Sequence, residues 1–234
     1  MYFQVEPAVW SRFPGMRIAA VVAQGLDNTV PRPAIGDAWQ ATWAEARAAA
    51  THFGNPQSHP HVRPWRDYWR ALGVSSKDFP SSIEALLRRA GKGGPPFTIN
   101  PLVDWYNTVS LRFIVPAGGY DLAAITAPLT LRLTGPGDTF LALDATEPVT
   151  VPSGEVAYTT SNAVLTRHLL WRQSRLGLLT PQTQDALLVS ELPAELDDAL
   201  AEQVLAALVA GLAEHFGVVG QGALVDERQP QLRW

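Results

Sequence analysis

The sequence of 234 residues contains no cysteine, and only 17% of its residues are charged. Without cysteine the chain can form no disulfide scaffold, no thiolate zinc site and no thiol nucleophile. The low charge does not indicate disorder, because 47% of the residues are hydrophobic, more than disordered sequences contain. A chain of this length is expected to bury a core as one large domain or two small ones.

Long hydrophobic runs are also missing. The longest apolar stretch, residues 204–212, is about half of the roughly 20 residues that a membrane-spanning helix needs. The first residues, MYFQVEPAVWSRF, lack the basic start and apolar run of a signal peptide. We therefore expect a cytoplasmic protein that does not enter a membrane.

The common nucleotide-binding and hydrolase motifs are absent. The sequence has no G-x-x-x-x-G-K-[ST] phosphate loop, no G-x-G-x-x-G and no G-x-S-x-G, and residues 91–94 (GKGG) have the wrong spacing for the first. His52, His59 and His61 lie close in sequence, but no carboxylate stands at a recognised ligand spacing from them. We expect no metal and no cofactor, and structural roles for these histidines in turns and at a helix entry.

Charge is distributed unevenly along the chain. The net charge of −4 and the sequence pI of about 5.7 argue against binding of nucleic acid through overall charge alone, and DNA is not expected as a partner. Residues 63–92 nevertheless hold seven basic and three acidic residues, whereas residues 176–227 hold nine acids and no Lys or Arg. The basic segment is either an RNA-binding face or a set of solvated helix faces. The candidate RNA-binding residues are Arg63, Arg66, Arg70, Arg88, Arg89 and Arg172.

Hydrophobic periodicity predicts helices first, then strands, then a closing helix. Helices are expected over residues 39–52, 65–72, 81–91, 102–111 and 193–216, and strands over 17–23, 129–134, 139–144, 155–159, 163–170 and 186–190. Trp65 and Trp69 could stack on bases, but they follow the apolar stripe of their helix, which favours burial. Residues 116–119 are typical of a tight turn, and residues 218–234 show no period.

The segregation of helices and strands favours an α+β fold in one domain, residues 1–234. Ser81 has the signature of a helix N-cap, since Glu84 completes a capping box, and Asn100 precedes a proline suited to the first helical position. The last predicted helix either closes the core or forms an interface. The oligomeric state is left open.

Two segments hold more small and polar residues than a core requires. Asn100, Asp104 and Asn107 are spaced four and three residues apart and share one helix face, either as a cap with a polar surface or as the lining of a pocket. Gly118 and Gly119 permit a close approach of the backbone to a ligand, or they form an ordinary turn.

These two segments, NPLVDWYN at 100–107 and PAGGYDL at 116–122, resemble the B3/B4 domain of the bacterial phenylalanyl-tRNA synthetase β subunit. The matching runs there have the form N-x-V-V-D-x-T-N and P-L-H-A-F-D-L, and free-standing B3/B4 proteins share the version found here. The likeness extends over about residues 13–191. It implies a three-layer β/β/α fold of packed, largely antiparallel sheets with outer helices, and a link to tRNA. In the synthetase this domain hydrolyses mischarged tRNA, chiefly tyrosine esterified to the phenylalanine tRNA.

The resemblance also implies site residues. Asn107 corresponds to the asparagine that borders the family's editing pocket, whereas Tyr106 replaces the preceding threonine and Gly118 replaces the turn histidine. Glu147 corresponds to a pocket glutamate that reads the tyrosine hydroxyl. The expected substrate-binding residues are Asn100, Asp104, Tyr106, Asn107, Tyr120 and Glu147.

Hydrolysis of an aminoacyl ester needs a positioned water and oxyanion donors, but no Ser or Cys nucleophile. The backbone amides of Gly118 and Gly119 are candidate donors, and Asp104, Asp121 or Glu155 could orient water or bind the substrate ammonium. No aminoacylation domain is expected in a chain of this length. Three functions remain open: a trans-editing deacylase of aminoacyl-tRNA, a non-catalytic RNA-binding module, and a pocket protein for a free amino acid or similar metabolite.

Overall fold

The computed structural model describes residues 1–234, in which most of the helices precede most of the strands along the chain. The α-helices are α1 (Pro7–Trp10), α2 (Pro33–His52), α3 (Arg63–Ala71), α4 (Ser82–Gly91), α5 (Pro101–Phe113) and α6 (Asp198–Gly211). Shorter segments are the 3-10 turns η1 (Pro56–Ser58) and η2 (Leu122–Ala124) and the π-helical turn η3 (Leu212–Phe216).

The strands form two sheets. The smaller sheet is antiparallel, in the order β11 (Gln221–Val225), β2 (Arg17–Ala23), β10 (Ala186–Leu192) and β3 (Gly118–Asp121). The larger sheet has the order β12 (Gln231–Arg233), β1 (Tyr2–Val5), β4 (Leu129–Leu133), β7 (Val156–Thr160), β8 (Ala163–Arg167), β5 (Thr139–Phe140) and β6 (Val149–Thr150), and β9 (Arg172–Gln173) pairs with β8. Its pairs are antiparallel except β1 with β4 and β5 with β8.

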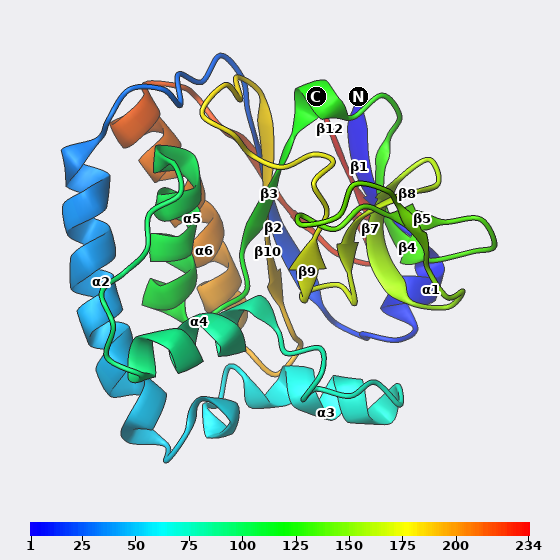
Figure 1. Cartoon of the computed structure of the whole chain (residues 1–234), viewed down its shortest axis with the longest axis horizontal. Coiled ribbons are helices and arrows are strands. Elements are labelled where there is room, and N and C mark those ends of the chain that lie inside the picture. The colour runs from blue at the N-terminus through cyan, green and yellow to red at the C-terminus, as the bar shows by residue number, and fades with distance from the viewer.

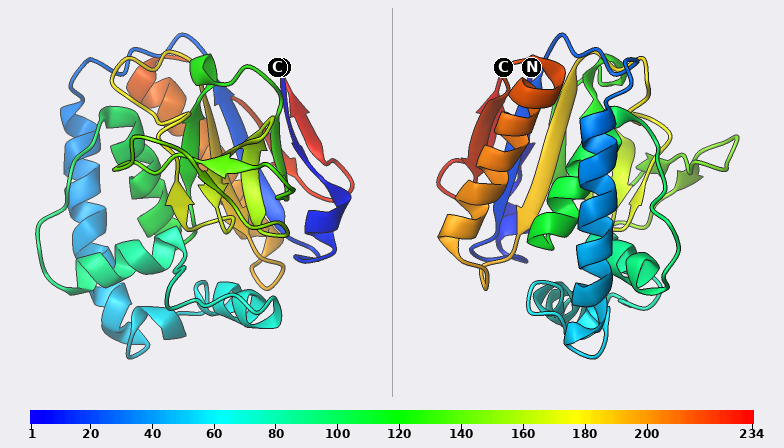
Figure 2. Two further views of the ribbon diagram at one scale, coloured as in Figure 1. Left: turned by 45° about the vertical axis from the view of Figure 1, so that its right-hand side comes forward. Right: turned by 90° about the vertical axis from the view of Figure 1, so that its left-hand side faces the viewer.

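The two sheets and the helices form three layers, as the resemblance to the B3/B4 domain implies (Figure 1). Helices α2, α5 and α6 lie on one side of the smaller sheet, and the larger sheet lies on the other, an arrangement that the turned views also show (Figure 2). The predicted α+β fold in a β/β/α arrangement is therefore confirmed. The two chain ends meet, because the Met1 ammonium donates to the Trp234 carbonyl at 3.1 Å.

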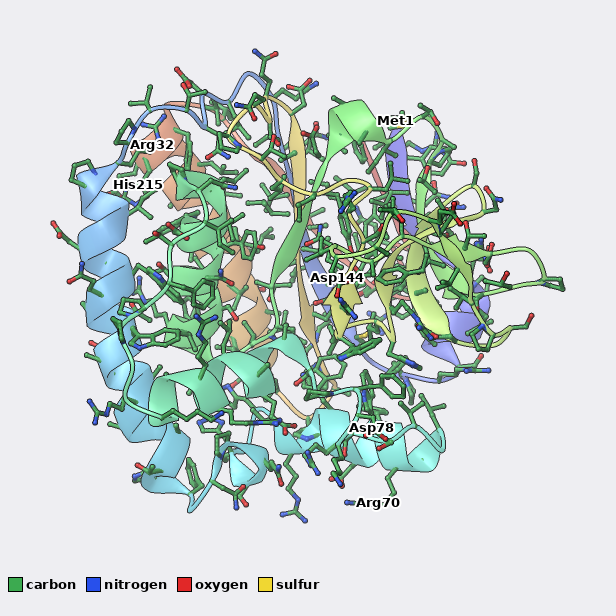
Figure 3. The ribbon with its side chains drawn as sticks, viewed as in Figure 1. Met1, Arg32, Arg70, Asp78, Asp144 and His215 are labelled. Carbon is green, nitrogen blue, oxygen red and sulfur yellow. The ribbon has the colours of Figure 1, made fainter.

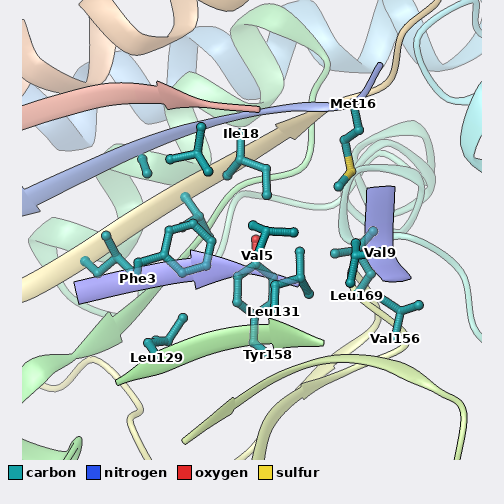
Figure 4. Packing of buried hydrophobic residues seen from close by; sticks show 14 of the residues in the cluster. Phe3, Val5, Val9, Met16, Ile18, Leu129, Leu131, Val156, Tyr158 and Leu169 are labelled. Carbon is teal, nitrogen blue, oxygen red and sulfur yellow. The ribbon is translucent and has the colours of Figure 1, made fainter. Parts of the chain in front are cut away.

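Alternation along β2 explains why the smaller sheet is the middle layer. Ile18, Ala20 and Val22 belong to the buried cluster between the sheets, whereas Ala19, Val21 and Ala23 belong to the cluster shared with α5 and α6. Because successive residues of a strand face opposite sides, a strand covered on both faces has an unbroken apolar sequence. Figure 4 shows the first cluster, in which Phe3, Ile18, Leu131 and Tyr158 meet between the sheets.

Helix α6 covers the outer face of the smaller sheet. It buries Ala201, Val204 and Leu208 in the cluster shared with β2 and α5, and η3 continues this face with Leu212. The 19-residue helical segment Asp198–Phe216 contains a stretch of 18 residues with mean hydropathy 1.3. By length and composition alone it could cross a membrane, contrary to the expectation from the shorter unbroken apolar run. A helix packed on a protein core meets the same criterion.

The predicted helix starts at Ser81 and Asn100 are confirmed. The Ser81 hydroxyl accepts the Glu84 amide at 3.4 Å, and the Asn100 side-chain oxygen accepts the Val103 amide at 3.0 Å. Each bond satisfies one backbone donor that the first helical turn leaves free. Trp65 and Trp69 are 1% and 3% exposed, so the prediction that they belong to the core is also confirmed.

Several predicted boundaries were wrong. The turn expected at residues 116–119 is in part the start of β3, because these residues pair with β10. Residues 218–234, which showed no hydrophobic period, form β11 and β12, strands too short for a period to be seen. Strand β8 ends three residues early, since His168 and Leu169 adopt left-handed φ angles of 44° and 58°. Helix α2 starts earlier than expected, at Pro33, and α6 starts later, behind its cap Asp197.

Candidate functional site

A pocket of about 360 Å³ opens where α4 and α5 meet the β3–β10 edge of the smaller sheet and the segment around β9. Its wall is mainly apolar, with side chains such as Leu86, Phe97, Val103 and Leu169. Pockets of this size and lining are typical of small-molecule sites, in which a few polar groups fix the ligand. The polar side chains that line it are Ser82, Arg89, Tyr106, Asn107, Tyr120, Thr166, Gln173 and Glu191.

Glu191 contributes a buried carboxyl group to this pocket. It lies on β10, two residues after Val189, so both side chains face the same side of the strand. Glu191 is 3% exposed, and one of its carboxylate oxygens accepts the Tyr158 hydroxyl. Burial raises the pKa of Glu191 to about 7, although the hydrogen bond from Tyr158 opposes this shift. The pocket therefore holds a carboxyl group that changes protonation near neutral pH.

Two neighbouring residues of α5 present polar groups that have no partner within the chain. Tyr106 and Asn107 are 8% and 7% exposed and line the pocket, yet neither the phenol nor the amide makes a hydrogen bond to another residue. The fully buried side-chain atoms that lack a hydrogen-bond partner do not include the Tyr106 hydroxyl or the Asn107 amide, so both groups open into the pocket. There they are available to water or to a ligand. Burial also raises the pKa of Tyr106, which keeps its hydroxyl a donor.

Asn100 and Asp104 lie on the same helix but not in this pocket. Asn100 caps α5 and accepts the Asn28 amide at 3.0 Å, while the Asp104 carboxylate accepts the Ile99 amide at 2.9 Å. Both residues line a separate shallow hollow beside the start of α2. Of the three residues on the predicted polar face, the structure places only Asn107 in the pocket, and the other two hold the start of the helix.

Gly118 and Gly119 both line the pocket, but their backbone amide and carbonyl groups point to opposite sides of β3. The Asp121 amide donates to the Gly177 carbonyl at 2.9 Å, and the Gly119 carbonyl accepts the Gln173 amide at 2.8 Å, both on the side away from β10. Since backbone groups alternate along a strand, Gly118 faces β10, where it is paired with Val189. Only the Gly119 amide therefore points away from the ladder. A Cβ at position 118 would have no atom from another part of the chain within 4 Å, so there is open space for a side chain at this position.

Four other predicted residues have distinct places. Tyr120 lines the pocket and shares a hydrogen bond with Thr166 at 2.8 Å. Asp121 lies at the end of β3, where it caps η2 and accepts the Thr183 hydroxyl at 2.6 Å. Glu155 lies in another cavity, paired with Arg167, and Glu147 lies on an exposed loop. The structure thus brings Tyr106, Asn107, Gly118, Gly119 and Tyr120 together, and does not bring Asn100, Asp104, Asp121, Glu147 or Glu155 to them.

The predicted basic residues gather on α3 and α4. Arg63 and Arg70 have side chains 74% and 77% exposed and flank Asp67, at 3.8 and 2.7 Å, and Figure 3 shows Arg70 directed away from the body of the protein. Arg66 and Arg88 share Glu84, at 3.0 and 2.8 Å. Four arginines therefore face two acids, which leaves this surface positive.

The last two arginines of the predicted set lie elsewhere. Arg89 lines the pocket, and its guanidinium carbon is 4.0 Å from the centre of the Phe97 ring. Arg172 on β9 pairs with Asp144 at 2.7 Å. Arg89 is thus the only member of the predicted basic set that lines the pocket.

Two of the three neighbouring histidines, His59 and His61, have structural contacts. His59 is buried and accepts the His61 amide at 3.1 Å, and the His61 ring is 2.9 Å from the Phe113 carbonyl. Burial lowers the pKa of His59 to about 4, so its ring is neutral at pH 7. No three His, Asp or Glu side chains of the structure lie close enough together to hold a metal ion.

Sequence reasoning missed Glu191, Gln173 and Thr166. A glutamate inside the apolar run ALLVSEL was the one available signal, because a buried strand rarely carries a charge without a role. Gln173 and Thr166 lie on short strands with no distinctive pattern, and only the fold brings them to the pocket.

Part of the chain is similar to a known protein family. The family model described as "B3/4 domain" matches residues 64–217, which contain all of the residues that line the pocket. A search of the curated proteins found no match. Among solved structures, an N-terminal fragment of the phenylalanyl-tRNA synthetase β-subunit from Pyrococcus horikoshii is similar, with a TM-score of 0.47 and 11% sequence identity. The alignment covers 96% of this chain and 54% of that fragment, so the chain spans about half the fragment's length. Since the family model matches well over half of its residues, the chain belongs to the B3/4 domain family.

Proposed function

We propose that this protein is a tRNA-associated hydrolase that removes the amino acid from mischarged aminoacyl-tRNA in trans. One observation carries the proposal: unpaired polar groups of Tyr106 and Asn107 and a buried carboxyl of Glu191 converge on one mostly apolar pocket. Family membership adds support, because the B3/B4 domain that the sequence resembles performs this reaction within a synthetase. A protein with this function would work in the cytoplasm.

The pocket suits an aminoacyl group better than a nucleotide base. Its volume of about 360 Å³ is at the small end of ligand sites and fits an amino-acid side chain with its ester. Phe97, Val103 and Leu169 provide an apolar wall, and the free donors of Tyr106 and Asn107 can hold the polar end of the substrate. The side chain that is read must therefore be largely apolar or aromatic.

The chemistry needs only water and oriented polar groups. Glu191, with a pKa of about 7, is partly ionised at neutral pH and can take a proton from water as the water attacks the ester carbonyl. The Gly119 amide, which points away from the β10 ladder, is the candidate oxyanion donor. The bond between the carbonyl carbon and the ribose oxygen then breaks, and the ribose hydroxyl leaves with the proton returned from the Glu191 carboxyl. Because water is the nucleophile, no covalent enzyme intermediate is formed.

Helix α4 connects the pocket with the basic surface. Ser82, Leu86 and Arg89 line the pocket, whereas Glu84 and Arg88 of the same helix join the cluster of Arg66. A tRNA whose aminoacyl end enters the pocket can lay its backbone phosphates across α4 and α3. Contacts of this kind are electrostatic and weaken as salt rises.

Deacylation of a panel of mischarged and correctly charged aminoacyl-tRNAs tests the proposal. We expect cleavage of one class above the uncatalysed rate, and the amino acid released defines what the pocket reads. Folded protein that binds tRNA without cleaving any member would be a non-catalytic RNA-binding module. Protein that neither cleaves nor binds tRNA would be a pocket protein for a free metabolite.

A further inference from the structure

A second cavity, of about 330 Å³, lies beside the main pocket and shares only Leu169 with it. It is bordered by the turn before β2, the end of α3 with its following loop, the segment that leads into β7, and the end of β8. Its apolar wall is formed by Phe13, Trp69, Leu72, Val74, Phe79 and Val156. Neither the proposed hydrolysis nor the proposed tRNA contacts use this cavity.

One charge pair in the cavity is already satisfied. Arg167 donates to both oxygens of Glu155, at 2.7 to 3.2 Å, and the His168 amide donates to the same carboxylate at 2.7 Å. The side chains of Glu155 and Arg167 are 4% and 18% exposed. Since Glu155 is bound by Arg167 and a backbone amide, it is poorly placed to accept a cationic ligand.

Arg12 is the cation in the cavity that lacks an acidic partner. Its guanidinium makes one hydrogen bond, to the Gly154 carbonyl at 2.7 Å, and forms no ion pair. The remaining guanidinium donors of this half-buried residue are free for a ligand. His168 adds no charge, because burial lowers the pKa of its ring. The cavity therefore has a net charge of about +1 beside a largely apolar wall.

The backbone at the wall between the cavities is strained. His168 and Leu169 both have left-handed φ angles, a conformation that costs a residue with a side chain about 1–2 kcal/mol. Glu155 holds this conformation through the His168 amide, and the His168 ring packs against the Phe79 ring at a tilt of 35°, with centroids 3.9 Å apart. Strain of this kind is found where a fold holds a binding surface in shape.

We propose that this second cavity binds a small carboxylate with an aromatic or branched apolar body. The carboxylate pairs with the free donors of Arg12, and the apolar body lies against Phe13, Trp69 and Val74. A forked guanidinium suits a carboxylate, with which it forms charge-assisted hydrogen bonds. The site is independent of the proposed hydrolase function.

Binding of phenylacetate and isovalerate, measured by calorimetry and by NMR of the tryptophan indole signals, tests this proposal. Trp69 lines the cavity and donates its indole N–H to the Phe79 carbonyl at 2.8 Å, so its signal should move on binding. Phenylacetamide has the same shape without the charge and should bind at least about tenfold more weakly. The Arg12→Gln variant should lose affinity for phenylacetate by a similar factor, whereas Arg228→Gln, on an exposed turn, should not.

Two further variants locate the binding. Val74→Phe fills the cavity without changing its charge and should abolish binding, while Gly118→Val narrows the main pocket and should leave it intact. Three results would overturn the proposal. They are unchanged affinity in both Arg12→Gln and Val74→Phe, loss of binding in Gly118→Val, and no binding of either acid to the wild type. Thermal denaturation of each variant distinguishes a lost site from a lost fold.

Discussion

At the residue scale, Glu191 is a buried carboxyl group that accepts a hydrogen bond from Tyr158 and lines an open pocket. A buried carboxyl is costly when ionised, and Tyr158 offsets only part of that cost, so the pKa lies at about 7 rather than at the ordinary 4.5. A carboxyl kept in this state is suited to proton transfer but reduces the stability of the fold. Glutamine at this position would keep the shape and remove the titration.

The effect of Glu191 on stability has a defined pH window. Between about pH 4.5 and 7 the folded protein keeps the proton that the unfolded chain releases, so this residue makes stability fall as pH rises through that window. We expect Glu191→Gln to gain stability relative to the wild type as the pH rises. The difference in free energy of unfolding between the two proteins should be larger at pH 8 than at pH 4, and this change should be at most about 3 kcal/mol. Urea unfolding of both proteins at the two pH values measures this difference. A difference that does not change with pH would contradict it.

Substitutions of the two pocket glycines, Gly118 and Gly119, are expected to differ in their effect on stability. Gly118→Val places methyl groups in open pocket space, so it should block substrate while leaving the melting temperature nearly unchanged. Gly119→Ala would bring its Cβ to 2.7 Å from a Leu179 methyl and 2.8 Å from a Leu188 methyl, and should destabilise the protein by about 1–3 kcal/mol. Thermal melts and deacylation rates of the two variants check both predictions. Hydrolysis unchanged in Gly118→Val would place the reaction elsewhere.

At the element scale, the layer of helices depends on a close contact between α5 and α6. Gly211 ends α6 against the Trp105 indole, and a Cβ there would lie 1.9 Å from the ring. Trp105 belongs to α5, the helix that also carries Tyr106 and Asn107. The position of the pocket's polar groups therefore depends on a glycine in another helix.

A matched pair of glycine substitutions tests this contact. Gly211→Ala should destabilise the protein by about 1–3 kcal/mol, because the buried ring must move. Gly36→Ala, in α2 with nothing within 4 Å of its Cβ, should stabilise it by about 0.5–1 kcal/mol through helix propensity. Denaturant unfolding measures both changes. If the two variants had equal stability, the α5–α6 contact would be looser than the structure shows.

The elements differ in how well sequence predicts them. The starts of α4 and α5 were predictable, because Ser81 and Asn100 act through bonds to residues only three positions away. Strand β3 was not, since its glycines suggest a turn and only the distant β10 makes them a strand. The residues of the pocket differ in the same way. Asn107 was predicted from its spacing along one helix, whereas Glu191 is distant from it in sequence, so only the fold shows that the two line the same pocket.

At the scale of the whole molecule, an acidic protein carries one basic surface. The net charge is −4, yet Arg63, Arg66, Arg70 and Arg88 gather around two acids on α3 and α4. Such a surface can attract a polyanion even though the average field repels it. The acidic remainder would limit contact to this face.

Charge reversal on this surface should weaken tRNA binding. The double variant Arg63→Glu and Arg70→Glu changes two exposed side chains and should lower affinity at least about tenfold and reduce the salt dependence of binding. Arg228→Gln, on the turn before β12, serves as the control and should bind as the wild type does. Filter binding over a range of salt concentrations measures both quantities. Equal affinity in the double variant would remove this face from the tRNA contact.

The most direct test of the central claim is the rate of deacylation of mischarged tRNA by the wild type and by Glu191→Gln as a function of pH. The account predicts a wild-type rate that rises with pH through a midpoint near 7, where Glu191 ionises. It also predicts a loss of about 10²–10⁴-fold in the variant, with tRNA affinity retained. A variant that deacylates as fast as the wild type, or a wild type that deacylates none of the substrates, would contradict it.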